Sequence, residues 1–207
     1  MTSTVTRFAT LLVAFAAALL LSACTPSTEQ AGGSASDGHT DHTHAPGEDS
    51  AEHGPHNAED ITFAQNMLPH HKQALELVDL ARANSTDPAL LQLAGAIAAA
   101  QGPEIGQMSE MLRSWGQNPD AAMDHSGHDM SMTGMVDAAT MQRLESLRGA
   151  EFDTLWLQSM ISHHQGAVEM ANAEIAGGQN AEAKTLAEHI VSTQEAEIAQ
   201  MKQMLEG

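Results

Sequence analysis

A Met-x-x-His-His motif occurs twice in the sequence and could bind a metal ion. The two copies are formed by Met67, His70 and His71 and by Met160, His163 and His164. Thioethers suit Cu(I), whereas imidazole nitrogens also suit Cu(II) and Zn. A methionine at helical spacing is usually core filler. Two adjacent histidines that follow a methionine at one fixed spacing, twice, favour a metal site, with copper the best candidate and zinc possible.

A Gln-x-x-Glu pattern follows each motif and adds carboxylates. Its residues are Gln101 and Glu104 in the first half, and Gln194 and Glu197 in the second. On a helical wheel the second pair falls on an apolar seam, where a charge is costly unless it is paired or bound to metal. Antiparallel packing would place Glu197 level with His163 and His164. The further predicted metal ligands are Glu104, Met108, Met170, Glu197 and Met201. Glu197 could instead orient one histidine through a hydrogen bond.

An internal repeat without gaps underlies the two motifs. The offset of 93 residues from Met67 to Met160 also relates Ile97 to Ile190. Apolar residues recur at three- and four-residue steps in each half, which is typical of helices. Each half is therefore predicted to be a helical hairpin, and two hairpins make a four-helix bundle. The expected fold is all-α, a bundle built from two duplicated helical hairpins.

The second half reads Met-Ile-x-His-His-x-x-Ala-x-x-Met-Ala and then Gln-x-x-Glu-Ile-x-x-Met-x-x-Met-Leu. This pattern resembles domain-of-unknown-function family number 305, and the resemblance covers about residues 60–207. It implies a ferritin-like helical fold and a link to copper binding and tolerance. The first half departs from the pattern, because Leu77 stands where the second half has Met170. Pro69 and Pro103 also lie there, and since proline removes a backbone donor, we predict a local kink or helix break.

The segment between the two halves is rich in methionine and histidine. Its donor residues are Met123, His125, His128, Met130, Met132 and Met135. Exposed methionines in a Gly- and Ser-rich loop have no core to fill, so packing does not explain them. We predict metal capture here. A flexible loop would exchange ions faster than a site inside the bundle, and it could pass copper to that site.

The N-terminus is predicted to direct export. Arg7 precedes an apolar run, and Leu-Ser-Ala-Cys ends it at Cys24, as in a secretory signal. The pattern resembles the lipobox of bacterial lipoproteins, which implies cleavage before Cys24, lipidation of its sulfur and anchoring to the outer face of the cytoplasmic membrane or elsewhere in the cell envelope. The alternative is an ordinary signal peptide with an incidental cysteine.

The predicted domains follow from these features. They are a signal peptide at 1–23, a flexible His-rich tether at 24–57, a first hairpin at 58–116, a Met/His-rich loop at 117–136 and a second hairpin at 137–207. The tether has almost nothing apolar to bury, which predicts a solvated spacer. Its histidines could also bind metal.

Charge restricts the possible partners. Asp and Glu total 27 against 8 Lys and Arg, so the chain should attract cations and should not bind nucleic acid. We expect an extracytoplasmic copper-binding protein, a buffer or chaperone in copper tolerance that could hand copper to a protein partner, and not an enzyme. Three alternatives remain open. One is a lipoprotein that binds zinc or another divalent metal, and another is a helical lipoprotein whose Met and His are only core. The third is a copper oxidase or ferritin-like oxidase, although the chain has no Glu-x-x-His pair of the di-iron type.

Overall fold

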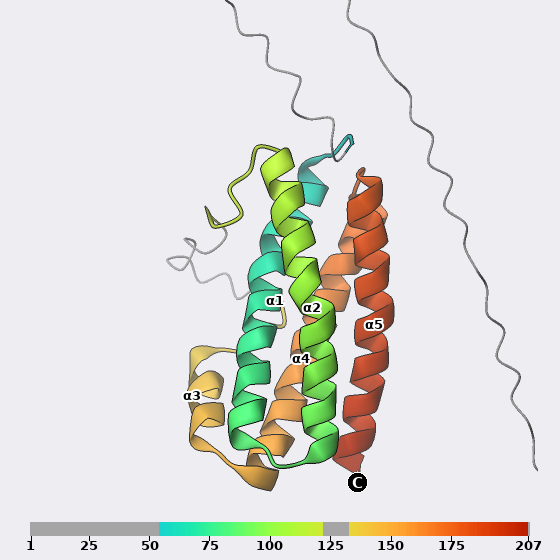
Figure 1. Cartoon of the computed structure of the whole chain (residues 1–207). Coiled ribbons are helices and arrows are strands. Elements are labelled where there is room, and N and C mark those ends of the chain that lie inside the picture. Colours follow the sequence, from blue (N-terminus) through green and yellow to red (C-terminus); the bar gives the residue numbers. More distant parts are fainter. Residues whose placement is uncertain (1–53, 122–132, 207) are drawn as a thin grey trace, which may run out of the picture. The chain divides into compact units, whose positions relative to one another are not determined.

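The computed structural model describes residues 54–121 and 133–206, and all of its regular elements are helices. They are α1 (Ala58–Asn84), α2 (Pro88–Ser114), α3 (Ala138–Ser146), α4 (Gly149–Gly177) and α5 (Ala181–Glu206). The all-α prediction is confirmed (Figure 1). None of the described helices combines the length and the apolar character that a bilayer span requires.

Local sequence signals set the helix starts. The Asn57 side chain accepts hydrogen bonds from the first turn of α1, and the Asp60 carboxylate accepts one from the Asn57 backbone N–H, which makes a capping box. The Asp87 side chain caps α2 by accepting from the backbone N–H groups of Ala89 and Leu90, and Pro88 occupies the first position of that helix, where its missing N–H costs nothing. Asp87 and Pro88 together therefore set the start of α2.

Of the predicted kink or helix break at the two prolines, the helix break does not occur. Both α1 and α2 run through Pro69 and Pro103 without interruption. A proline removes one hydrogen bond of the helix. The long helices and their neighbours hold the local backbone helical despite that loss. The first half is therefore built as two continuous helices, like the second.

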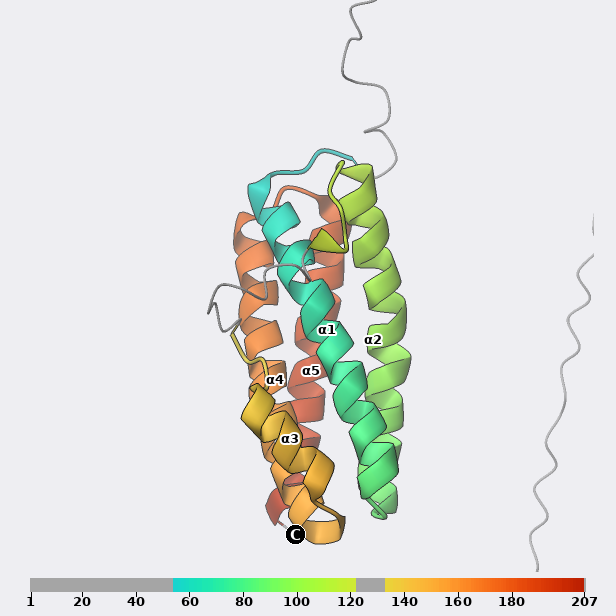
Figure 2. The same cartoon turned by 90° about the vertical axis from the view of Figure 1, so that its left-hand side faces the viewer.

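The four long helices form two antiparallel hairpins that pack side by side. α1 pairs with α2, α4 pairs with α5, and α1 also packs along α4, whereas α2 and α5 touch only sparsely. Figures 1 and 2 show α3 on the outside of the bundle beside α1 and α4. The second hairpin is reached through one long crossover, residues 115–148. A bundle with one long crossover has the ferritin-like connectivity.

Two apolar clusters fill the bundle, one toward each end, and each draws on all four long helices. The first contains Phe63, Met67, Met108 and Ile190, and the second contains Trp156, Met160, Met201 and Ile97. The 93-residue offset exchanges these two sets. The repeat is therefore a pseudo-twofold symmetry of the core, which relates one end of the bundle to the other.

A polar clamp ties the start of α1 to the turn between α4 and α5. Asp60 accepts hydrogen bonds from the backbone N–H groups of Gln179 and Asn180, and the Asn57 side chain donates to the Gly177 carbonyl oxygen. The Glu174 carboxyl group is fully buried beside Asp60. Burial, with the neighbouring Asp60, raises the pKa of Glu174 to about 8, so this carboxyl group is neutral at pH 7.

The neutral Glu174 predicts a pH dependence of stability. The carboxyl group ionises near its ordinary pKa of 4.5 in the unfolded chain but only near 8 in the folded one. Its contribution is therefore complete below pH 4.5 and is lost as the pH rises toward 8. We expect Glu174→Gln to gain on the order of 2 kcal/mol relative to the unmodified chain between pH 5 and pH 8. Urea unfolding at several pH values measures this, with the exposed Glu188→Gln as the control for lost charge. Parallel stability curves would contradict it.

Candidate metal centre

A layer of eight buried polar side chains separates the two apolar clusters. Its members are His70, His71, Gln101, Glu104, His163, His164, Gln194 and Glu197. On each of the four long helices, one pair of these residues lies between the part that enters the first cluster and the part that enters the second. The layer therefore crosses the bundle at its middle, and the two predicted motifs contribute equally to it.

Each half of the layer holds one histidine on a carboxylate. His71 Nε2 lies 2.8 Å from Glu104 Oε2, and His164 Nε2 lies 2.7 Å from Glu197 Oε2. Since a carboxylate accepts, each imidazole donates its Nε2 proton, and in a neutral ring the lone pair is then on Nδ1. A carboxylate that fixes a histidine in this way is the usual partner of a metal-binding imidazole. The contact agrees with the prediction that Glu197 and His164 lie at the same height in the hairpin.

The two remaining histidines meet at the centre of the layer. The ring centroids of His70 and His163 are 3.7 Å apart, and the rings are inclined by 33°. Among residues 54–121 and 133–206, no group makes a hydrogen bond of acceptable geometry with either nitrogen of either ring, or with the Nδ1 atoms of His71 and His164. Buried polar atoms without partners cost free energy. Six unpartnered ring nitrogens in one layer are therefore a feature that a bound ion would explain.

The electrostatics of the layer keep the central histidines neutral. Burial, reinforced by His71 and His164, lowers the pKa of His70 to about 3. The nearby Thr133 backbone opposes this shift but satisfies neither ring nitrogen. Burial also holds the pKa of His163 well below its ordinary range, with His70 as the next cause. Neutral imidazole is the form that binds metal ions, so both rings are ready to act as ligands.

The predicted sulfur ligands lie on both sides of the layer. Met67 and Met108 belong to the first apolar cluster, and Met160 and Met201 belong to the second, all four fully buried. Met170 packs against the first cluster, away from Met160, so these two thioethers do not share one cluster. Each half thus has one histidine on a carboxylate with two methionines in the apolar cluster next to it.

Nitrogen and oxygen donors alone do not complete a site. Among residues 54–121 and 133–206, no three His, Cys, Asp or Glu side chains form a group that could hold a metal ion. Tetrahedral zinc sites use three or four such ligands. A site in this layer would need thioether sulfur as well, and soft sulfur ligands select Cu(I). The donor set therefore fits copper better than zinc.

The end of the crossover rests against the histidine layer. The Gln73 side chain holds both the N–H and the carbonyl oxygen of Val136, each at 2.8 Å. Gly134, at φ +86°, lies against Gly166 and the His163 carbonyl, where a side chain would not fit. Met135 is half-buried in this segment. The other predicted loop ligands, Met123, His125, His128, Met130 and Met132, lie outside the described residues, as do Cys24 and the tether up to residue 53.

A substitution at Gly166 should break the contact between the crossover and the histidine layer. A Cβ atom at residue 166 would overlap the Thr133 carbonyl group and lie 2.7 Å from the Gly134 Cα atom. Both are backbone atoms, so the crossover would have to move away from the layer. We expect Gly166→Ala to destabilise the fold by about 1–3 kcal/mol.

The matched control is Gly95→Ala, where a Cβ atom meets nothing within 4 Å. There we expect no loss, or a gain of up to about 1 kcal/mol from the helix preference of alanine. Urea unfolding of both variants measures the difference. A Gly166→Ala protein as stable as the Gly95→Ala protein would show that the crossover does not depend on this contact.

Two features of the site were not predicted from the sequence. One is the close packing of Gly134 against Gly166. The other is His189, whose Nε2 lies 3.9 Å from Glu104 Oε1. A comparison of the repeats could have found the second, because the 93-residue offset relates His189 to Ala96. A histidine on only one side of a duplicated site is a sequence signal in itself.

Known proteins resemble this chain in sequence and in structure. A DUF305 protein from Streptomyces coelicolor, solved as a presumed secreted protein, is 32% identical over 72% of this chain and 92% of its own, with a TM-score of 0.64. A DUF305 fragment from Deinococcus radiodurans is 34% identical over 74% and 99%, with a TM-score of 0.65. CopM in its Cu(II)-bound form is 33% identical over 71% and 95%, with a TM-score of 0.62, and CopM has also been solved with Cu(I) and with Ag bound. No curated protein matches the sequence. The model of the domain of unknown function DUF305 matches residues 60–205, and the chain therefore belongs to the DUF305 family.

Proposed function

We propose that the protein binds copper, as a buffer or chaperone for Cu(I) and Cu(II) outside the cytoplasm. The observation that carries this proposal is the buried layer with six unpartnered imidazole nitrogens, which has methionines in the apolar cluster on each side. The similarity to CopM supports the choice of metal, because that protein has been solved with Cu(II), Cu(I) and Ag.

In this proposal the ligands differ in role. In each half the Nδ1 atom of one carboxylate-held histidine, His71 or His164, binds the ion. The central rings of His70 and His163 contribute further nitrogens, and the thioethers of Met67 and Met160, with those of Met108 and Met201, provide the soft ligands that Cu(I) prefers. Met170 lies outside this inner group. The loop ligands from Met123 to Met135 capture ions and pass them to the bundle.

We propose a binding role and not a catalytic one. All four histidines of the layer have no exposed surface, so a substrate larger than an ion would not contact them in this arrangement. We also propose export through the N-terminal signal and lipid anchoring at Cys24. Mass spectrometry of protein from the membrane fraction tests the anchor, since Cys24→Ser would abolish the lipid modification.

Competition for metal tests the proposed function. The purified protein is titrated with Cu(I) against bathocuproine disulfonate, and with zinc against a chromophoric zinc chelator. We expect the protein to withdraw Cu(I) from its chelator. A second protein without residues 120–135 should bind fewer ions but keep the Cu(I) bound by the bundle. Tight zinc binding without any uptake of Cu(I) would refute the proposal.

A further inference from the structure

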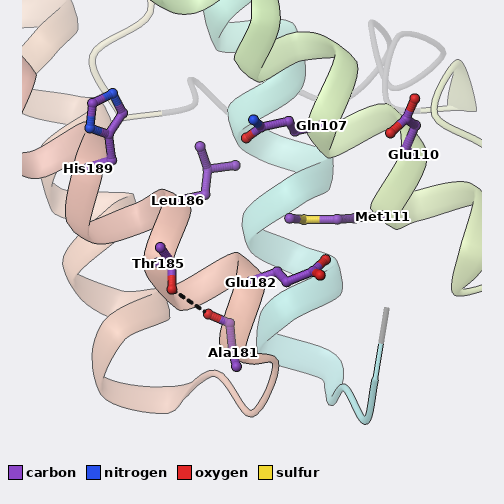
Figure 3. Close-up of a pocket in the computed structure, with 8 residues that line it drawn as sticks. All are labelled: Gln107, Glu110, Met111, Ala181, Glu182, Thr185, Leu186 and His189. Atoms are coloured by element: carbon purple, nitrogen blue, oxygen red, sulfur yellow. Dashed lines mark hydrogen bonds between the residues drawn. The ribbon is translucent and has the colours of Figure 1, made fainter. Parts of the chain in front are cut away.

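The seam between α2 and α5 is hollowed next to the first half of the layer. These helices make far fewer contacts with each other than with their hairpin partners, and a cavity of about 540 Å³ lies between them. Figure 3 shows the side chains that line it, which come from the C-terminal half of α2 and the N-terminal half of α5. Several of them are metal-binding types, namely Glu110, Met111, Glu182 and His189.

Glu104 connects this seam with the buried layer. Its Oε2 atom lies 2.8 Å from His71 Nε2, and its Oε1 atom lies 3.9 Å from His189 Nε2. The three side chains differ sharply in exposure, since His71 is 0% exposed, Glu104 is 6% exposed and His189 is 64% exposed. One carboxylate therefore stands between a histidine inside the bundle and a histidine in contact with solvent.

This arrangement is absent from the equivalent position in the second half. The 93-residue offset replaces His189 with Ala96, Glu182 with Ala89 and Glu110 with Gln203. Among the described residues, Glu197 pairs only with His164. The ligands of the buried layer are duplicated, whereas three of the four metal-binding side chains of the seam are not, since only Met111 recurs, as Met204.

We propose that the α2–α5 seam is the port through which copper reaches and leaves the first half of the layer. The proposal rests on copper binding by the layer. His189 captures the ion at the surface, and the carboxylates of Glu110 and Glu182 raise the local cation concentration. Glu104 lies between the two histidines, and its carboxylate leads the ion from His189 into the layer, where the Nδ1 atom of His71 binds it. The second half has no such port and exchanges its ion more slowly.

Kinetics of Cu(I) release test the port, with the full chain as the protein. The copper-loaded protein is mixed with excess bathocuproine disulfonate, and the absorbance of the chelator complex is followed by stopped flow. We expect His189→Ala to slow one of the bundle phases about tenfold, while the equilibrium amount of bound Cu(I) stays the same. Alanine at an exposed helical position keeps the fold intact. The reverse change, Ala96→His, should accelerate release from the second half.

Two observations keep the outcomes apart. Long-range NMR spectra of ¹⁵N-labelled histidine report whether the His71 ring responds to Cu(I). If it responds and His189→Ala releases copper at the unmodified rate, the port is refuted while copper binding stands. If the His71 ring of the unmodified chain does not respond to Cu(I), both the first-half site and its port are refuted. Gln158→Ala, an exposed residue of α4 outside the seam, is the control and should leave every phase unchanged.

Discussion

Replacing both central histidines by leucine, His70→Leu with His163→Leu, is expected to stabilise the copper-free protein and to abolish its stabilisation by copper. The two rings have no exposed surface and four ring nitrogens without partners. Each unpaired buried polar group costs about 1–3 kcal/mol, so leucines that fill the same space should raise the free energy of unfolding by at least about 2 kcal/mol. The unmodified chain, in contrast, should gain about 4 kcal/mol from Cu(I) held at a thousand times its dissociation constant.

Thermal unfolding with and without Cu(I) measures both effects on the same samples. The two rings are ligands if the double substitution raises the free energy of unfolding without copper and also removes the stabilisation by copper. A side chain that serves only packing cannot be unfavourable without copper and required with it. His56→Leu is the matched control, since His56 stacks on Trp115 outside the layer, with its ring centroid 5.0 Å from that of the indole. A double variant that copper stabilises as much as the unmodified chain would rule out the central rings as ligands.

The carboxylates of the layer are expected to control affinity through the histidines that they hold. Glu197→Ala removes the acceptor 2.7 Å from His164 Nε2 and frees the ring to change tautomer and orientation. Loss of such a partner typically lowers metal affinity about 10–100-fold. Glu197→Gln keeps an oxygen that can accept the same hydrogen bond, so its loss should be smaller.

Titration against a Cu(I) chelator gives the affinities, and urea unfolding of the copper-free proteins gives the accompanying stability change. Glu104→Ala and Glu104→Gln repeat the test in the first half, where His71 holds the equivalent position. If alanine and glutamine variants bind Cu(I) as tightly as the unmodified chain, the carboxylates serve only to satisfy the imidazole N–H groups.

The contact between His164 and Glu197 could be predicted from the sequence because it depends on local rules. The glycine pair Gly177-Gly178 ends one helix, and antiparallel counting from that turn places the two residues at one level. The same offset then predicts His71 with Glu104. Helix starts were equally accessible, since Asp87 and Pro88 are strong local signals.

The stack of His70 on His163 could not be predicted in this way. It depends on which faces of α1 and α4 meet, and no residue pattern within one hairpin specifies how it turns toward the other. The separation of Met170 from Met160 has a similar origin, because ten residues of helix place them in different apolar clusters. Met170 is a predicted ligand like Met160, but the cluster that each thioether enters is a tertiary property that the repeat alone does not encode.

The 93-residue repeat relates the residues of one apolar cluster to those of the other. This relation has a consequence for how such a chain can arise and fold. Each cluster takes residues from both hairpins, so neither hairpin encloses a core of its own. A single hairpin could bury its apolar face only by pairing with a second copy, and the motif histidines of the two copies would then meet on the symmetry axis, as His70 and His163 do here. Duplication within one chain retains that dimer geometry while allowing the two halves to diverge, as His189 and Ala96 have done.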